Sequence, residues 1–457
     1  MPPISEILKK QRQFFATNHT KDISFRIASL RKLEHWIQGH YEDIFAALKQ
    51  DLNKPPFEAY ATEIAIVLTE LKLMLKKVRR WSNPKCVASN LINFPSSAKI
   101  YPEPYGVALI MSPWNYPFQL CVAPIVAAVA AGNCAVVKPS EYSPATSALI
   151  GKMCKELFDD EHIAVVEGGV SESQALLNEY YDLIFFTGST TVGKIVMQAA
   201  AKHLTPVVLE LGGKSPCIVD ETASIKLAAK RIVWGKLVNA GQTCVAPDFL
   251  LVHESVKKML IEEMKIAIQD MYGEKPLDNQ DFPKIINIQH FNRLMKLIRD
   301  EKIVMGGDSN PITLQIEPTL LDVVSWDTPI MQEEIFGPIL PILSFSNFED
   351  LIKMLTSLPK PLAAYLFTSD KNNERFFLRN LSFGGGCIND TIMHLSVSKL
   401  PFGGVGESGM GTYHGKAGFD AFSHYKSILK KSTLIDVPMR YPPYSHKGLK
   451  WLMKMQK

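Results

Sequence analysis

The residue best suited to covalent chemistry is Cys244, which lies in a short polar turn after a helix-like run. Residues 239–247 read NAGQTCVAP, and the apolar residues Ile232, Val233 and Leu237 precede them. Because the residues around the cysteine are small or favour turns, its sulfur can be reached from a cleft and can act as a nucleophile. The alternative is a small core residue, which is the commoner fate of a free cysteine.

A second candidate for chemistry, Glu210, lies upstream in the run VLELGGK at residues 208–214. This glutamate stands between two leucines at the end of a strand-like run. If it is buried there, its pKa is raised, and the carboxylate becomes suited to general-base work near neutral pH. The alternative is a surface glutamate at a strand end. A reactive thiol together with a tuned carboxylate suggests covalent catalysis followed by attack of water.

These two stretches resemble the aldehyde dehydrogenase superfamily, and the resemblance extends from about Phe25 to Tyr444. It implies that Cys244 is the nucleophile, that Glu210 activates the water that releases the acid, and that the Asn115 amide and the Cys244 backbone N–H stabilise the oxyanion. Further motifs in the family's order are PWNYP at 113–117, KPSE at 138–141, TGST at 187–190, EEIFGP at 333–338 and LPFGG at 400–404. Each motif is weak alone, but their order and spacing together are very specific.

Length and composition limit the classes of protein that the chain can belong to. A chain of 457 residues with 46% hydrophobic and 21% charged residues is ordinary for a globular protein of two or three domains. The net charge of +4 gives no reason to expect nucleic acid as a partner. The seven cysteines form no zinc-like pattern, so we expect no metal and a reducing, cytoplasmic location. No signal pattern and no apolar run of about 18 residues is present, so no spanning helix is expected.

Short apolar strands that alternate with helices predict an α/β fold. Strands are expected at 107–111, 134–137, 164–166 and 182–186, with helices between them, and this pattern indicates a parallel sheet. With the resemblance, we expect a variant Rossmann cofactor domain, an α/β catalytic domain and a small oligomerisation arm. The predicted boundaries are 1–82 and 101–210 for the NAD(P)-binding domain, 211–390 for the catalytic domain, 83–100 and 391–445 for oligomerisation or bridging segments, and 446–457 for a C-terminal tail.

A glycine-containing turn after the fourth of these strands is the candidate phosphate site. Gly188, Ser189 and Gly193 open a helix whose amides can hold a pyrophosphate, although the motif is not the usual G-x-G-x-x-G. Such turns are more often structural, but the resemblance implies a dinucleotide here, with Thr187 at the strand end. It also implies that Lys138 and Glu141 meet the adenosine ribose, and that Glu334 and Phe336 hold the nicotinamide end. The carboxylate favours NAD over NADP, and the lysine leaves dual use open.

The resemblance also places the aldehyde tunnel and the branch of the family. Tyr116, Trp234, Ile392 and His414 are expected to line the tunnel. The segments SGMGTYHGK at 408–416 and RYPPY at 440–444 are similar to the class 3 group of fatty and aromatic aldehyde enzymes, which implies a homodimer. Thr62 and Ile66 depart from that group's acidic or aromatic residues, which puts an aromatic-specific pocket in doubt. We therefore expect a medium- or long-chain aliphatic or an aromatic aldehyde.

Two rival functions and a tail hypothesis stay open at this point. A relative that acylates coenzyme A would commonly lack the glutamate at 210, and a non-enzymatic protein on this fold would not need Cys244, Asn115 and Glu334 together. Lys447, Lys450, Lys454 and Lys457 alternate with apolar residues over 446–457, a pattern typical of a helix at a membrane surface. The alternative for this tail is packing on the dimer or disorder.

Overall fold

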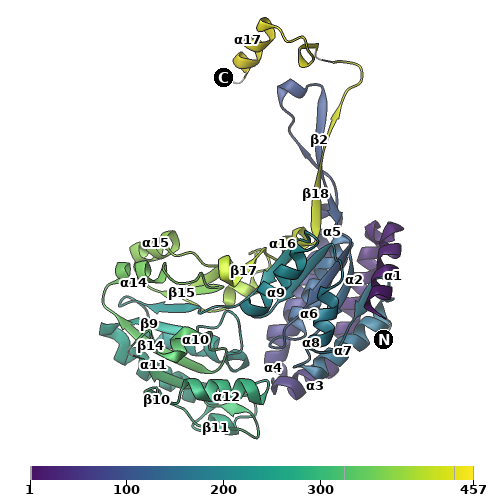
Figure 1. Cartoon of the computed structure of the whole chain (residues 1–457). Helices are drawn as coiled ribbons and strands as arrows, with labels where there is room; N and C mark the ends of the chain where they lie inside the picture. The colour runs from purple at the N-terminus through teal and green to yellow at the C-terminus, as the bar shows by residue number, and fades with distance from the viewer. Residues whose placement is uncertain (1–2, 324, 437, 456–457) are drawn as a thin grey trace. The chain divides into compact units, whose positions relative to one another are not determined.

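The computed structural model describes residues 3–323, 325–436 and 438–455, which form two compact units (Figure 1). The first unit comprises Met1–Trp81 and Pro104–Ser423, and the second comprises Ser82–Glu103 and His424–Lys457. The predicted α/β class is confirmed. The predicted domain boundaries differ from the limits of these units and stay a prediction. Among the described residues, no helix is both long and apolar enough to cross a bilayer.

A six-stranded sheet forms the first half of the large unit. Its strand order is β17-β7-β6-β3-β4-β5, and all neighbours are parallel except β17, which runs antiparallel to β7. The carboxyl ends of β3, β4 and β6 therefore meet at one edge, where open α/β sheets bind ligands. The strands are β3 (Val107–Met111), β4 (Cys134–Lys138), β5 (Ile163–Val165), β6 (Leu183–Thr187), β7 (Val207–Glu210) and β17 (Gly409–Met410).

Helices cover both faces of this sheet, and one of them is buried along its whole length. Every residue of α6 (Gln119–Ala131) is buried, which explains why its sequence is apolar on all sides. The helix α3 (Tyr41–Leu52) is absent from the predicted elements, although Ile44, Leu48 and Leu52 form a short buried stripe along it. The other helices are α1 (Ile4–Ala16), α2 (Ile23–Gly39), α4 (Pro56–Ala59), α5 (Ala65–Trp81), α7 (Pro144–Leu157), α8 (Val170–Leu177) and α9 (Thr190–Ala201), with a π-helix, η2 (Tyr60–Ile64), between α4 and α5.

A seven-stranded sheet forms the second half of the large unit. Its order is β10-β13-β14-β9-β8-β15-β16, and only the β10–β13 pair is antiparallel. The strands are β8 (Pro216–Val219), β9 (Phe249–His253), β10 (Ile303–Met305), β13 (Thr319–Asp322), β14 (Ile339–Phe345), β15 (Ala363–Phe367) and β16 (Gly385–Ile388). A small hairpin pairs β11 (Ser309–Asn310) with β12 (Gln315–Ile316). The helices are α10 (Ile225–Leu237), α11 (Glu254–Tyr272), α12 (Ile288–Leu297), α13 (Pro329–Gln332), α14 (Phe348–Leu355), α15 (Lys371–Asn380) and α16 (Gly415–Ala421).

The second unit is a three-stranded sheet followed by a short helix. Its strand order is β1-β2-β18, with β1 (Lys85–Val87), β2 (Ser96–Pro104) and β18 (Ser423–Lys431). An ion pair between Lys426 Nζ and Glu103 Oε1, at 2.6 Å, joins two of these strands. The helix α17 (His446–Met455) ends the described chain.

Candidate active site

The turn that carries Cys244 is built from left-handed backbone. After α10 the chain passes through Asn239 and Ala240 with φ of 56° and 51°, and then Gly241 with φ of 73°. A Cβ at residue 241 would stand 2.2 Å from the Gly337 carbonyl oxygen, so only glycine fits. This sharp turn redirects the chain after α10 and places Cys244 on the wall of a cavity instead of inside the helix.

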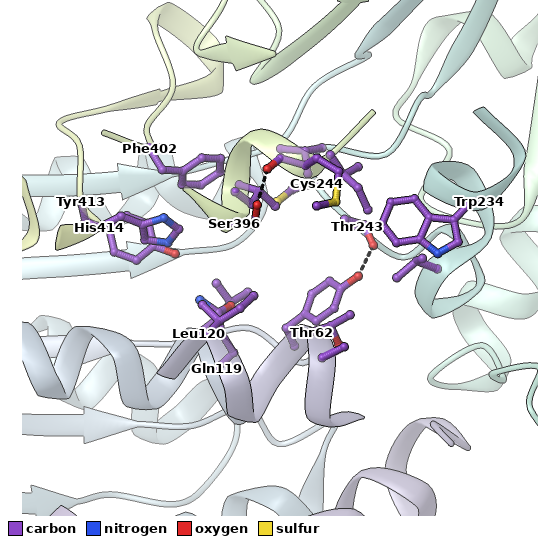
Figure 2. Close-up of a pocket in the computed structure, with 18 of the residues that line it drawn as sticks. Thr62, Gln119, Leu120, Trp234, Thr243, Cys244, Ser396, Phe402, Tyr413 and His414 are labelled. Atoms are coloured by element: carbon purple, nitrogen blue, oxygen red, sulfur yellow. Dashed lines mark hydrogen bonds between the residues drawn. The ribbon is translucent and has the colours of Figure 1, made fainter. Parts of the chain in front are cut away.

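That cavity has a volume of about 370 Å³, within the usual range of small-molecule sites. All four predicted tunnel residues, Tyr116, Trp234, Ile392 and His414, line it together with Cys244. Figure 2 shows Trp234, His414 and Cys244 in this wall. Sequence reasoning missed most of the other lining residues, and none of the described residues in the wall is acidic or a lysine or arginine. The remaining lining residues are Phe57, Ala61, Thr62, Ile66, Gln119, Leu120, Val238, Thr243, Val245, Met393, Leu395, Ser396, Phe402 and Tyr413.

Asn115 lies on the loop after β3 and is tied to the cysteine turn. Its Nδ2 donates to the Gln242 carbonyl oxygen at 3.0 Å, two residues before Cys244. An amide NH₂ has two hydrogens, so this bond leaves one N–H for another acceptor. Tyr116, the next residue, shares a hydrogen bond of 2.6 Å between its hydroxyl and Thr243 Oγ1. The loop after β3 is therefore bonded to Gln242 and Thr243, the two residues directly before the cysteine.

Glu210 is the last residue of β7 and is buried, as the strand-end position predicts for the functional alternative. It pairs in register with Gly409 of β17. Neither carboxylate oxygen has a hydrogen-bond partner among the described residues. Burial raises the pKa of Glu210 well above its ordinary value because the charged form loses its hydration. Once it is ionised, this unpartnered carboxylate is available to accept a proton from a water molecule.

The electrostatics around Cys244 favour the protonated thiol. Burial first, and then the negative charges of Glu334 and Glu210, raise the pKa of Cys244 to about 12. Backbone N–H groups of Cys244 and Val245 act in the opposite direction. Both carboxyl groups therefore lie close enough to the sulfur to oppose the thiolate. Burial also raises the pKa of Glu334 to about 8, so that its charge develops near neutral pH.

The predicted cofactor residues gather at the carboxyl edge of the first sheet. Lys138 ends β4 and forms an ion pair of 2.7 Å with Glu141. Thr187 ends β6, and its buried hydroxyl has no described partner. Ser189 caps α9 by accepting from the Val192 N–H at 3.3 Å, and this leaves other first-turn amides of the helix unpaired.

Two closely packed glycines and Phe336, which has a positive φ, lie along the rest of this edge. A Cβ at residue 188 would stand 2.5 Å from the Phe186 ring, and one at residue 193 would stand 2.6 Å from Leu211, so both glycines permit close packing. Phe336 has a φ of 55° and packs edge-to-face on Trp114 with ring centroids 5.3 Å apart. The loop of Glu334 and Phe336 therefore meets the loop that carries Asn115.

The family model "Aldehyde dehydrogenase family" matches residues 4–428. The chain belongs to the aldehyde dehydrogenase family. The 4,4'-diaponeurosporen-aldehyde dehydrogenase of Staphylococcus aureus is 50% identical over 95% of this chain and 95% of that protein. Aldehyde dehydrogenase family 3 member A2 of Pongo abelii is 42% identical over 97% of this chain and 92% of that protein. The solved structure of the substrate-bound state of Staphylococcus aureus AldH has a TM-score of 0.98 at 48% identity, with 100% of both chains covered.

This aldehyde dehydrogenase oxidises aldehydes to carboxylic acids with a nicotinamide cofactor. The expected resemblance to family 3 members is confirmed, and the matches favour neither the coenzyme A-acylating nor the non-enzymatic alternative. The residues at the carboxyl edge fit a dinucleotide. Thr187 offers a buried free hydroxyl, the first turn of α9 offers amides for phosphates, and Glu141 offers a carboxylate for hydroxyl groups.

Proposed function

We propose that this enzyme oxidises elongated apolar aldehydes, with Cys244 as nucleophile, Asn115 as oxyanion donor and Glu210 as general base. The observation that carries the proposal is the cavity beside Cys244, whose wall is mostly aliphatic and aromatic and contains no acidic residue, lysine or arginine among the described residues. Burial lowers the pKa of His414 in this wall to about 4, so that it is neutral at pH 7. The relative with 50% identity is named for a diaponeurosporen aldehyde, which supports an apolar substrate.

The reaction is a covalent oxidation at the aldehyde carbon. The Cys244 sulfur, once deprotonated, adds to the carbonyl carbon, and the oxyanion accepts hydrogen bonds from Asn115 Nδ2 and the Cys244 N–H. A nicotinamide cofactor held with the help of Lys138, Glu141 and Glu334 would supply the acceptor for the hydride of this carbon, and Cys244 would then carry the acyl group as a thioester. The ionised carboxylate of Glu210 takes a proton from water, the resulting hydroxide adds to the thioester carbonyl, and the carboxylic acid leaves as the thiol reforms.

The test of this proposal is a series of straight-chain aldehydes together with benzaldehyde, in wild type and Cys244→Ala. Each methylene that enters an apolar cavity is worth about 0.8 kcal/mol, so kcat/KM should rise about fourfold per methylene until the cavity is filled. Cofactor reduction should vanish in Cys244→Ala. A flat series, or a preference for short hydrophilic aldehydes, would contradict the substrate class.

We propose NAD as the preferred cofactor, because Glu141 supplies a negative charge where a ribose is expected. Its ion pair with Lys138 weakens the repulsion of a 2′-phosphate, so that NADP is also used. Related solved structures contain either cofactor: a betaine aldehyde dehydrogenase from Staphylococcus aureus contains NAD⁺, and a glyceraldehyde-3-phosphate dehydrogenase from Methanocaldococcus jannaschii contains NADP. Glu141→Gln should shift the kcat/KM ratio toward NADP by at least about tenfold. If the ratio of kcat/KM for the two cofactors is unchanged, Glu141 does not determine the cofactor preference.

We propose a cytoplasmic homodimer that assembles through the small three-stranded sheet. The strand β18 is an edge strand in which most residues are exposed, including the apolar Tyr425, Ile428 and Leu429. A long exposed edge favours pairing with another chain. Sedimentation velocity at micromolar concentration should give a dimer, and Ile428→Glu with Leu429→Lys should give a monomer. A wild-type monomer would contradict the proposal.

We also propose that α17 contacts membrane surfaces. Leu449, Trp451 and Met453 are exposed on this helix beside Lys447 and Lys450, while Lys457 lies outside the described residues. Apolar and basic faces on one helix are typical of interfacial binding. Deletion of residues 446–457 should abolish sedimentation with anionic liposomes, while aldehyde oxidation in solution stays unchanged. Equal sedimentation of both forms would contradict membrane contact.

A further inference from the structure

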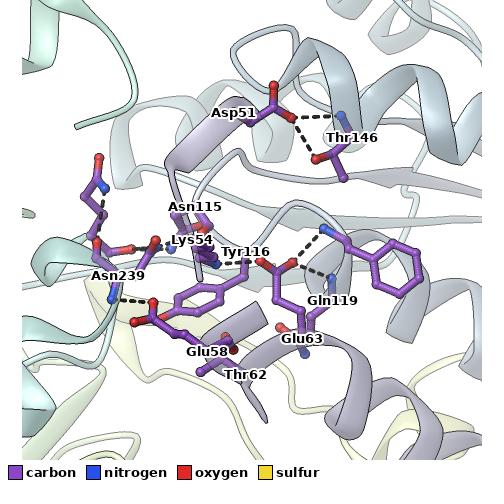
Figure 3. A network of polar contacts seen from close by, with 12 residues as sticks. Asp51, Lys54, Glu58, Thr62, Glu63, Asn115, Tyr116, Gln119, Thr146 and Asn239 are labelled. Carbon is purple, nitrogen blue, oxygen red and sulfur yellow. Dashed lines mark hydrogen bonds and ion pairs between the residues drawn. The ribbon is translucent and has the colours of Figure 1, made fainter. Parts of the chain in front are cut away.

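A fully buried lysine lies beneath the loop that carries Asn115 (Figure 3). Lys54 stands between α3 and α4, and its side chain is 0% exposed. Its Nζ forms an ion pair of 2.5 Å with Glu63 Oε1 and donates to the Asn115 carbonyl oxygen at 3.2 Å. Burial of a charge is costly unless the charge is paired and hydrogen-bonded, so this arrangement needs both contacts.

Glu63 holds the other end of the same loop. Its second oxygen, Oε2, accepts from the backbone N–H groups of Phe118 and Gln119 at 2.9 and 3.1 Å. These amides open α6, where a carboxylate is favoured by unpaired N–H groups and the helix dipole. The Lys54–Glu63 pair therefore fastens the segment 115–119 at both ends, from the Asn115 carbonyl to the first turn of α6.

The same pair connects this loop to the cysteine turn. The Lys54 ammonium lies 4.0 Å from the centre of the Tyr116 ring, whose hydroxyl is bonded to Thr243. Asn239 Nδ2 donates to the Asn115 carbonyl oxygen at 2.7 Å, so this oxygen accepts from the buried pair and from the turn at once. Figure 3 shows these side chains converging on the Asn115–Tyr116 backbone.

We propose that the Lys54–Glu63 ion pair is a positioning device that sets the backbone at Asn115 and thereby aims its side-chain amide at the oxyanion. The proposal rests on the oxyanion role of Asn115 proposed above. Neither residue of the pair lines the cavity, so the pair acts through Asn115 and not on the substrate. Misplacement of a catalytic group by about 1 Å can cost about 10²-fold in rate, which is the scale expected here.

The main test is the double variant Lys54→Met/Glu63→Gln, which removes both charges together. Replacement of a buried pair by neutral groups of similar volume leaves stability nearly unchanged more often than removal of one partner does. Methionine keeps an unbranched stem against Tyr116, and glutamine keeps an acceptor for the α6 amides. We expect kcat to fall about 10- to 100-fold, with KM for aldehyde and the Kd for cofactor changed by less than about threefold.

The matched control is Gln11→Met, which removes two hydrogen bonds from a buried amide to the Ala135 and Asp160 carbonyls, far from the cavity in sequence and fold. It should lower the melting temperature as much as the double variant or more, and kcat should stay within about twofold of wild type. If kcat follows melting temperature across both variants, the pair is merely structural and the proposal is overturned. If the double variant does not fold, Glu63→Gln alone must lower kcat about fivefold at constant KM, and an unchanged kcat overturns the proposal.

A double-mutant cycle with Asn115→Ala separates the two proposals. If Asn115 is the oxyanion donor, Asn115→Ala lowers kcat about 10²- to 10³-fold, and a smaller loss than tenfold removes the role on which the pair depends. In the Asn115→Ala background, the Lys54→Met/Glu63→Gln changes should lower kcat only slightly further. If these changes lower kcat by the same factor in wild type and in Asn115→Ala, the pair does not act through Asn115, and the proposal is overturned while the oxyanion role of Asn115 stands.

Discussion

The structure predicts that the Cys244 thiol reacts slowly in the enzyme without ligands. Its pKa is raised from 9.0 to about 12, first by burial and then by Glu334 and Glu210. At pH 8 the thiolate fraction is then about 10³-fold below that of an ordinary thiol. A more basic thiolate is also a stronger nucleophile. With a Brønsted slope of about 0.4–0.5, the rate constant of the thiolate itself rises by a factor of about 16–30. The net expectation is a reaction with a small disulfide reagent about 30- to 60-fold slower than in the unfolded chain.

The assay is thiol–disulfide exchange with a pyridyl disulfide, followed by mass spectrometry of the Cys244 peptide because the chain has seven cysteines. The rate should rise about tenfold per pH unit from pH 7 to 10 without a plateau, because the thiol titrates above this range. Glu334→Gln should speed the reaction at pH 9 but not at pH 6.5, because the pKa of Glu334 is about 8 and its charge is absent at the lower pH. A plateau near pH 8, or a rate equal to that of the unfolded chain, would refute the reasoning.

Three further predictions concern single substitutions. Glu210→Gln should lower kcat about 10²- to 10⁴-fold and leave a burst of one equivalent of reduced cofactor, and steady turnover without a burst would contradict its role in thioester hydrolysis. Glu70, buried and bonded to the Gly415 N–H at 2.8 Å, has a pKa raised by burial from 4.5 to about 7, so the protein loses stability as the pH rises from about 4.5 to about 7. Glu70→Gln should therefore raise the melting temperature at pH 8 by about 2–3 °C more than at pH 5, which corresponds to about 2–3 kcal/mol, and scanning fluorimetry at the two pH values measures this. Gly241→Ala should yield little folded enzyme by circular dichroism, because its Cβ would stand 2.2 Å from the Gly337 carbonyl oxygen, and a folded, active variant would contradict the required turn geometry.

Residues in local motifs could be predicted from the sequence because their neighbours dictate their place. Asn115 and Tyr116 lie in the short loop that follows the buried strand β3, so the strand end limits where they lie, and Glu210 is fixed by the end of β7. The four predicted tunnel residues all line the cavity. Their roles in catalysis stay a prediction, as do the roles of the residues at the cofactor edge.

Other residues of the site could not be predicted, because no local sequence pattern distinguishes them. Leu120 belongs to α6, which is buried on every side, so hydrophobic periodicity cannot tell which of its residues borders a cavity. Lys54 stands next to two prolines in a segment that reads as an ordinary polar loop, and its partner Glu63 is brought to it by the π-helix η2. The sequence alone does not predict this buried ion pair, because its two residues come together and lose contact with water only when the chain folds.

The charge distribution around the cavity accounts for how such a nucleophile is kept out of side reactions. Oxidants and electrophiles attack the thiolate, and a thiol whose pKa is about 12 presents almost none at neutral pH. Burial also raises the pKa of Glu210, whose carboxylate oxygens have no hydrogen-bond partner among the described residues, so burial favours the neutral form of both groups. Protonation of Glu334 would act in the direction of releasing the thiolate, because the negative charge of Glu334 is the second cause of the raised Cys244 pKa. The reactivity of the thiol is therefore tied to the charge of Glu334, whose own pKa is raised to about 8.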